Sequence, residues 1–133
     1  MILVAHSSAL LAILLGEPER AGFEELLLAH EVKIAAGTLI ETLRVVQLGL
    51  GPEGLAGVDE LLATTGAEVV PVDADQVGAA REGMLRFGKG RGEERAVLNF
   101  GDLFAYALAK RLGLPLLYKG EDFARTDVEA VRV

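Results

Sequence analysis

The sequence predicts an α/β domain in which a parallel sheet is packed against helices. Short apolar runs alternate with longer segments whose apolar residues recur every three or four positions. The expected strands are residues 2–5, 32–35, 68–72 and 114–118, with 128–133 as a candidate edge strand. Strands that alternate with helices form parallel sheets with right-handed crossovers. With 133 residues, of which 51% are hydrophobic, residues 1–133 can bury one core and are expected to form a single domain.

Capping residues and glycines define the helices of the N-terminal half. Ser7 or Ser8 can cap the first helix, and the Thr38-x-x-Glu41 spacing matches a capping box at the start of the third. The Gly51-Pro52 pair predicts a turn into a fourth helix. The first expected helix ends at residue 15. The next three span residues 18–29, 38–50 and 52–65.

The C-terminal half carries two further helix signals. Asp73 and Gln76 form a second capping signal, which opens a helix that runs through residue 87. The glycine-rich and basic residues 88–92 then predict a mobile loop. Asn99 is expected to cap a helix over residues 100–112, with Asp102 in its first turn and Gly113 at its end. Residues 122–123 predict one further helical turn.

Composition limits the cellular setting and the ligand. The chain has no cysteine, which excludes disulfides and thiolate metal sites, and no membrane-spanning run or leader, so a cytoplasmic location is expected. The net charge of -7 is unevenly placed: residues 1–80 hold 3 basic and 12 acidic residues, and residues 81–133 hold 10 and 8. Basic residues at 86, 89, 91 and 95 suit an anionic substrate, although each is also typical of a solvated surface.

Four candidate site residues come from four separate segments of the chain. His6, Glu41 and Asp122 each follow a predicted strand, and Asp102 lies in the first turn of a helix. Because strand carboxyl ends and helix N-termini share one edge of a parallel sheet, we expect these side chains to meet. Clustered carboxylates repel one another unless a proton or a cation intervenes, and Mg²⁺ is the usual cation.

Each candidate also has a purely structural interpretation. Asp102 can stabilise a helix N-terminus, the capping box accounts for Glu41, and Asp122 can be a solvated loop residue. A lone histidine such as His6 is more often a satisfied polar residue than a ligand. Convergence of all four on one edge favours a site, since independent caps need not converge.

At these residues the chain resembles the PIN-domain ribonucleases, and among them the VapC-type toxins of bacterial toxin–antitoxin pairs. The resemblance runs from residue 1 to about residue 127 and is most specific over residues 98–109, which contain Asn99 and Asp102. Residues 1–19, 38–41 and 117–127 match the family's other motifs. The resemblance implies a PIN-like three-layer α/β/α fold with a parallel sheet of four to five strands.

The resemblance also implies an activity. It implies Mg²⁺- or Mn²⁺-dependent hydrolysis of RNA phosphodiester bonds, a homodimer, and inhibition by a small VapB-like antitoxin. By this resemblance the acidic ligands are Glu41, Asp102 and Asp122. The supporting polar residues are Ser8, Asn99, Thr126 and Asp127.

One position departs from the family pattern. His6 stands where the family's opening motif has its first aspartate, so one carboxylate is missing. Imidazole is a poor Mg²⁺ ligand and accepts Mn²⁺ or Zn²⁺ more readily. The chain is therefore expected to be a weakened ribonuclease or, as an alternative, an inactive module that binds antitoxin or RNA. A receiver-like phospho-acceptor domain is disfavoured, because the first strand ends in His6 rather than in an acidic pair.

Overall fold

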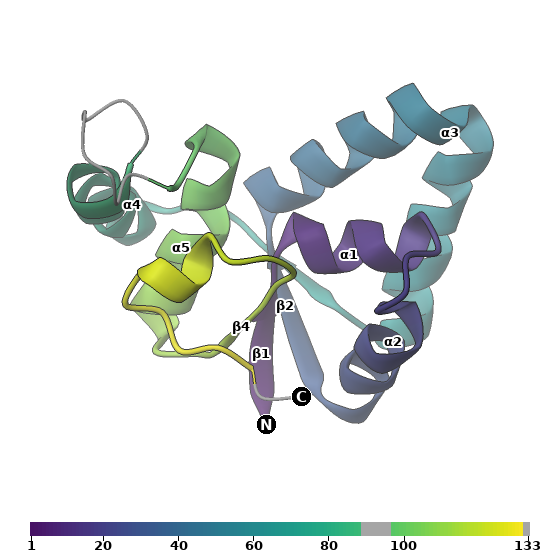
Figure 1. The fold of residues 1–133 in the computed structure, drawn as a ribbon, viewed down its shortest axis with the longest axis horizontal. Helices are drawn as coiled ribbons and strands as arrows, with labels where there is room; N and C mark the ends of the chain where they lie inside the picture. Colours follow the sequence, from purple (N-terminus) through teal and green to yellow (C-terminus); the bar gives the residue numbers. More distant parts are fainter. Residues whose placement is uncertain (89–96, 132–133) are drawn as a thin grey trace.

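The protein is built on a four-stranded parallel sheet with the strand order β3-β2-β1-β4. The computed structural model describes residues 1–88 and 97–131 (Figure 1). The strands are β1 (Ile2–Ala5), β2 (Glu31–Ala35), β3 (Glu68–Val70) and β4 (Leu116–Leu117). The predicted α/β class and parallel sheet are confirmed. Of the expected edge strand at 128–133, the described part forms a parallel bridge between Ala130 and Leu116.

Helices cover both faces of this sheet, which confirms the three-layer arrangement (Figure 1). They are α1 (Ser7–Leu14), α2 (Arg20–Ala29), α3 (Ala36–Thr65), α4 (Ala74–Phe87) and α5 (Phe100–Leu112), followed by the 3₁₀ turn η1 (Phe123–Arg125). Side chains of β1 alternate between the faces: Leu3 and Ala5 pack with α1 and α2, and Val4 packs with α5. None of the described helices is both long enough and apolar enough to cross a membrane.

Two of the predicted helix starts are wrong. His6 rather than a serine caps α1, because its Nδ1 accepts a hydrogen bond from the Ser8 backbone N–H at 3.1 Å. Strand β2 runs directly into α3, which begins at Ala36 without a side-chain cap. Thr38 is fully buried inside this helix, so core packing overrides the local capping pattern. Glu41 consequently lies in the second turn of α3, where the capping box does not account for it.

The remaining helix signals are confirmed, except that α2 begins at Arg20 rather than at Pro18. Gly51 adopts φ 67° and kinks α3 before Pro52, and Gly66 ends the helix in the left-handed region. Asp73 caps α4 by accepting from the Gln76 backbone N–H at 2.8 Å. Of the loop predicted at residues 88–92, residues 89–92 lie outside the described part of the chain, as do the basic residues Lys89, Arg91 and Arg95.

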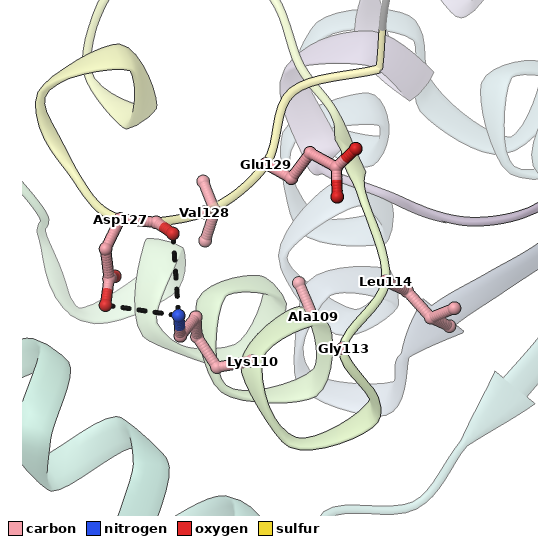
Figure 2. A pocket seen from close by; sticks show the side chains of 7 residues that line it. All are labelled: Ala109, Lys110, Gly113, Leu114, Asp127, Val128 and Glu129. Atoms are coloured by element: carbon pink, nitrogen blue, oxygen red, sulfur yellow. Dashed lines mark hydrogen bonds and ion pairs between the residues drawn. The ribbon is translucent and has the colours of Figure 1, made fainter.

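Asp127 fastens the C-terminal segment to the helical layer. It accepts a hydrogen bond from the Tyr106 hydroxyl at 2.7 Å and pairs with Arg86 at 3.0 Å and Lys110 at 3.1 Å. Figure 2 shows Lys110 between the carboxylate and the carbonyl oxygen of Asp127, at the rim of a pocket of about 210 Å³. Partial burial alone would raise the pKa of Asp127, but the hydrogen bonds from Tyr106 and Lys110 and the charge of Arg86 hold that pKa below its ordinary value.

We expect the Asp127→Asn variant to lose about 1–2 kcal/mol of unfolding free energy at neutral pH, because two cations and a hydroxyl lose their anionic partner. The lowered pKa means that the carboxylate stabilises the fold at pH values above its unfolded pKa of about 3.9. That contribution disappears as the pH falls through the folded-state pKa. Urea unfolding measures this effect at several pH values. The unfolding free energies of the wild type and of Asp127→Asn should therefore converge in acid.

The matched control is Asp75→Asn, because the Asp75 side chain is 72% exposed and pairs only at the surface with Arg111 at 3.2 Å. This control should change stability little at any pH. The assigned role of the carboxylate would be contradicted if the unfolding free energies of wild type and Asp127→Asn differed by the same amount from neutral to acid pH.

Candidate active site

Three elements bring polar side chains to the carboxyl edge of the sheet. His6 directly follows β1, and its backbone N–H is held by the Leu117 carbonyl of β4 at 2.9 Å. Glu41 reaches the same edge from α3, which continues β2. Asp102 reaches it from the first turn of α5. The topology therefore delivers an imidazole and two carboxylates to one place, as the sequence predicts.

A buried hydrogen bond joins His6 to Asp102. The distance between His6 Nε2 and Asp102 Oδ1 is 2.9 Å. On the other side of the ring, Nδ1 accepts from the Ser8 backbone N–H at 3.1 Å, and the Ser8 hydroxyl oxygen lies 2.8 Å away. Because a backbone N–H can only donate, Nδ1 must be the acceptor, and Nε2 carries the proton that points at Asp102. His6 is therefore fixed as a hydrogen-bond donor to the carboxylate.

The Ser8 hydroxyl helps to fix this tautomer. The backbone N–H of Lys119 donates to Ser8 Oγ at 2.9 Å, which occupies an acceptor position of the hydroxyl. The hydroxyl hydrogen is then available for His6 Nδ1. The ring of Phe123 also packs edge-on against the imidazole, with 4.7 Å between the ring centroids.

Asp102 both caps its helix and takes part in the site. Its Oδ2 accepts from the Asn99 backbone N–H at 3.0 Å, while Asn99 Oδ1 accepts from the Asp102 backbone N–H at 3.0 Å. This reciprocal capping box confirms the predicted cap and orients the carboxylate. The structural and the functional interpretations of Asp102 are therefore compatible, since each uses a different oxygen.

Glu41 is held between α1 and α5. Its Oε1 accepts a hydrogen bond from the Ser7 hydroxyl at 2.8 Å. The carboxylate also lies over the backbone of Gly101, so closely that a methyl group at this position would overlap it. The absence of a side chain at residue 101 therefore lets α3 and α5 approach at the site.

Three of the predicted residues are not part of this network. Asp122 precedes Phe123, so its backbone is near His6, but its side chain is exposed and caps nothing. Thr126 donates to the Phe123 carbonyl at 2.7 Å and so stabilises the local turn. Asp127 belongs to the cluster with Tyr106 described above. Across residues 1–88 and 97–131, no group of three His, Asp or Glu side chains is placed to share a metal ion.

Sequence reasoning missed two contributors to the site. The sequence indicates Ser7 only as a helix cap, whereas its hydroxyl binds Glu41 in the structure. Gly101 is the second, and its residue type alone is no signal, because Gly22 in the first turn of α2 has nothing within 4 Å of an added methyl group.

The side chains that could act as ligands do not fit Mg²⁺ in this arrangement. Both oxygens of Asp102 and one oxygen of Glu41 already accept hydrogen bonds. A cation at Asp102 Oδ1 would have to displace the Nε2–H of His6. To bind the cation itself, Nε2 would have to lose its proton, and a proton moved to Nδ1 would face the Ser8 backbone N–H. The hydrogen bonds thus argue against His6 as a ligand in this ring orientation.

Comparison with known proteins identifies the family. The PIN domain family matches residues 4–129. Ribonuclease VapC of Mycolicibacterium smegmatis is 44% identical over 130 residues, which cover 97% of this chain and 99% of that protein. Ribonuclease VapC30 of Mycobacterium tuberculosis is 41% identical, with coverage of 97% and 98%.

Solved structures share the fold at low sequence identity. Mycobacterium tuberculosis VapC20, described as a Sarcin-Ricin loop cleaving toxin, superposes with a TM-score of 0.78 at 19% identity and covers 98% of this chain and 99% of its own. VapBC2 of Rickettsia felis, solved with a DNA fragment from its promoter, gives a TM-score of 0.78 at 16% identity, with coverage of 99% and 98%.

The resemblance inferred from residues 98–109 is confirmed by a family match that spans nearly the whole chain. Sequence identities above 40% to VapC ribonucleases, along almost the full length of the chain, place it in one group within the family. This chain belongs to the PIN domain family and, within it, to the VapC ribonucleases.

Proposed function

We propose that this chain is the toxin of a toxin–antitoxin pair, an endoribonuclease whose divalent-metal site is weakened by His6. The observation that carries the proposal is the convergence of Glu41 and Asp102 at the carboxyl edge of the sheet, where the Ser7 hydroxyl that binds Glu41 lies 3.4 Å from the His6 Nε2 that donates to Asp102. The carboxylates of α3 and α5 are two of the ligands that a Mg²⁺- or Mn²⁺-assisted hydrolysis of RNA would use, once the N–H group of His6 no longer occupies Asp102 Oδ1. Asp122 is the proposed third acid, at the exposed start of η1.

His6 changes what this site can hold. In place of an anionic oxygen it presents an N–H group, which occupies Asp102 Oδ1. The site thereby loses one unit of negative charge, and its remaining acids are satisfied by hydrogen bonds within the protein. Both effects lower the affinity for a hard cation.

The proposed partners follow from the family. We propose a VapB-like antitoxin, a homodimer and an RNA substrate, acting in the cytoplasm. Support for the antitoxin comes from the Rickettsia felis VapBC2 structure, because that complex contains a chain with the same fold.

The second candidate function is a module that binds RNA or antitoxin without cutting RNA. The His6–Asp102 hydrogen bond favours it, because this bond satisfies one oxygen of the Asp102 carboxylate without an ion. Titration of Mn²⁺ against a single-stranded RNA separates the two functions: cleavage at high Mn²⁺ supports the enzyme, and binding without cleavage supports the module.

Restoring the carboxylate should restore the activity. We expect His6→Asp to raise Mg²⁺-dependent RNA cleavage at least about tenfold, since a metal ligand is worth no less than the outer-shell groups whose loss costs 10–100-fold. Cleavage of a fluorescent RNA and calorimetric Mg²⁺ titration provide the measurements. His6→Asn is the matched control, because it supplies an amide without the negative charge and should restore little. A folded His6→Asp protein that neither binds Mg²⁺ better nor cuts faster would sink the proposed site.

The position of Glu41 can be tested through its neighbour. In the His6→Asp background, Gly101→Ala should lower cleavage about tenfold or more, because the added methyl group displaces the Glu41 carboxylate. The temperature of thermal unfolding should change little. The displaced Glu41 carboxylate costs stability, and alanine offsets this cost because it is favoured over glycine in a helix by about 1 kcal/mol. Gly78→Ala in α4 is the control, because nothing lies within 4 Å of the added methyl group. Equal activity of the Gly101→Ala variant and its parent would exclude a role for this Glu41 position.

A further inference from the structure

Phe100, the first residue of α5, presents a large aromatic ring to solvent. The residue is 77% exposed, although it lies two positions before the buried Asp102. Its ring makes an edge contact with Phe104, with 5.2 Å between the centroids and an interplanar angle of 77°. This contact braces the ring and leaves most of its surface uncovered.

A pocket of about 280 Å³ lies beside this ring, and we call it the Phe100 pocket. Its walls include Ile40, Glu41, Arg44, Phe100 and Phe104. The pocket therefore combines an aromatic surface, a cation and one of the two acids of the candidate active site. Glu41 links it to that site directly, because the same carboxylate accepts the Ser7 hydroxyl.

We propose that Phe100 stacks on an unpaired base of the RNA substrate and that Arg44 pairs with a neighbouring phosphate. This inference rests on the proposed ribonuclease function and adds to it the two residues that hold the substrate beside the acids. Aromatic rings that stack on splayed-out bases are the usual means by which proteins hold single-stranded RNA. A base on Phe100 places its own backbone within reach of the acidic edge, because Glu41 forms the adjoining wall.

The charges in the pocket favour RNA over a protein surface as the occupant. Arg44 is exposed, and within residues 1–88 and 97–131 no carboxylate lies at ion-pair distance from it. A protein that covered the pocket would bury the Arg44 cation and would have to supply an anion for it. An RNA strand supplies a flat apolar base for the ring and an anionic phosphate for the cation.

The test measures RNA binding without added metal, so that cleavage plays no part. The probe is a short unstructured RNA that carries 2-aminopurine, whose fluorescence is quenched by stacking, and affinity is read by anisotropy. Phe100→Ala and Phe100→Leu should weaken binding about 5- to 100-fold and lose the quenching that Phe100 causes, whereas Phe100→Trp should retain both. Arg44→Ala should weaken binding and reduce the salt slope by about one phosphate contact.

Leu28→Ala is the control for loss of an exposed apolar side chain, since Leu28 is 61% exposed on α2. This variant should bind RNA like the wild type. The stacking proposal is overturned if Phe100→Leu binds and quenches normally while the wild type binds RNA, a result that leaves the ribonuclease function intact. No RNA binding by the wild type or by His6→Asp overturns both proposals. Dissociation of a dimer by Phe100→Leu in sedimentation, with RNA binding unchanged, would assign the pocket to a second copy.

Discussion

The hydrogen bond from His6 to Asp102 is the interaction on which the candidate site depends. It joins the end of β1 to the start of α5, two segments that are 96 residues apart in sequence. A buried carboxylate is costly unless it is hydrogen-bonded or paired, and here an N–H group of the protein satisfies one of its oxygens. The same bond therefore explains why the buried carboxylate is stable without an ion. Ser8 and the Lys119 backbone N–H make the arrangement specific, because they fix which ring nitrogen carries the proton.

How much of the site the sequence could predict depends on how local each signal is. The cap formed by Asn99 and Asp102 was predicted correctly, because it involves only four consecutive residues and their own backbone. The same kind of reasoning failed for Thr38 and Glu41, which have the spacing of a capping box but lie inside α3. Thr38 is drawn into the core, and β2 continues into the helix without a break. Topology nevertheless placed Glu41 correctly, since the edge of a parallel sheet does not depend on where a helix begins.

Side chains in the C-terminal segment could not be placed in the same way. Topology brings the backbone of Asp122 near His6, but in a short 3₁₀ turn it does not determine where the side chain points. Asp127 is held by residues from α4 and α5, and these ion pairs come from helix packing that no local pattern in the sequence reveals. The resemblance to the family identified residues 117–127 as a family motif. The packing of α4 and α5 determines the role of the Asp127 side chain within it.

Glycine is what allows the two acid-bearing helices to meet. A methyl group at Gly37 would overlap the ring of Phe104, and one at Gly101 would overlap the carboxylate of Glu41. Helices α3 and α5 thus approach through a glycine on each, at the turns that carry the site. This close approach holds Glu41 against the start of α5, and since Phe104 fills the space between the helices, Phe100 is left outside as an exposed ring beside the acid. The positioning of the acid and the exposure of the ring are therefore two consequences of one packing contact.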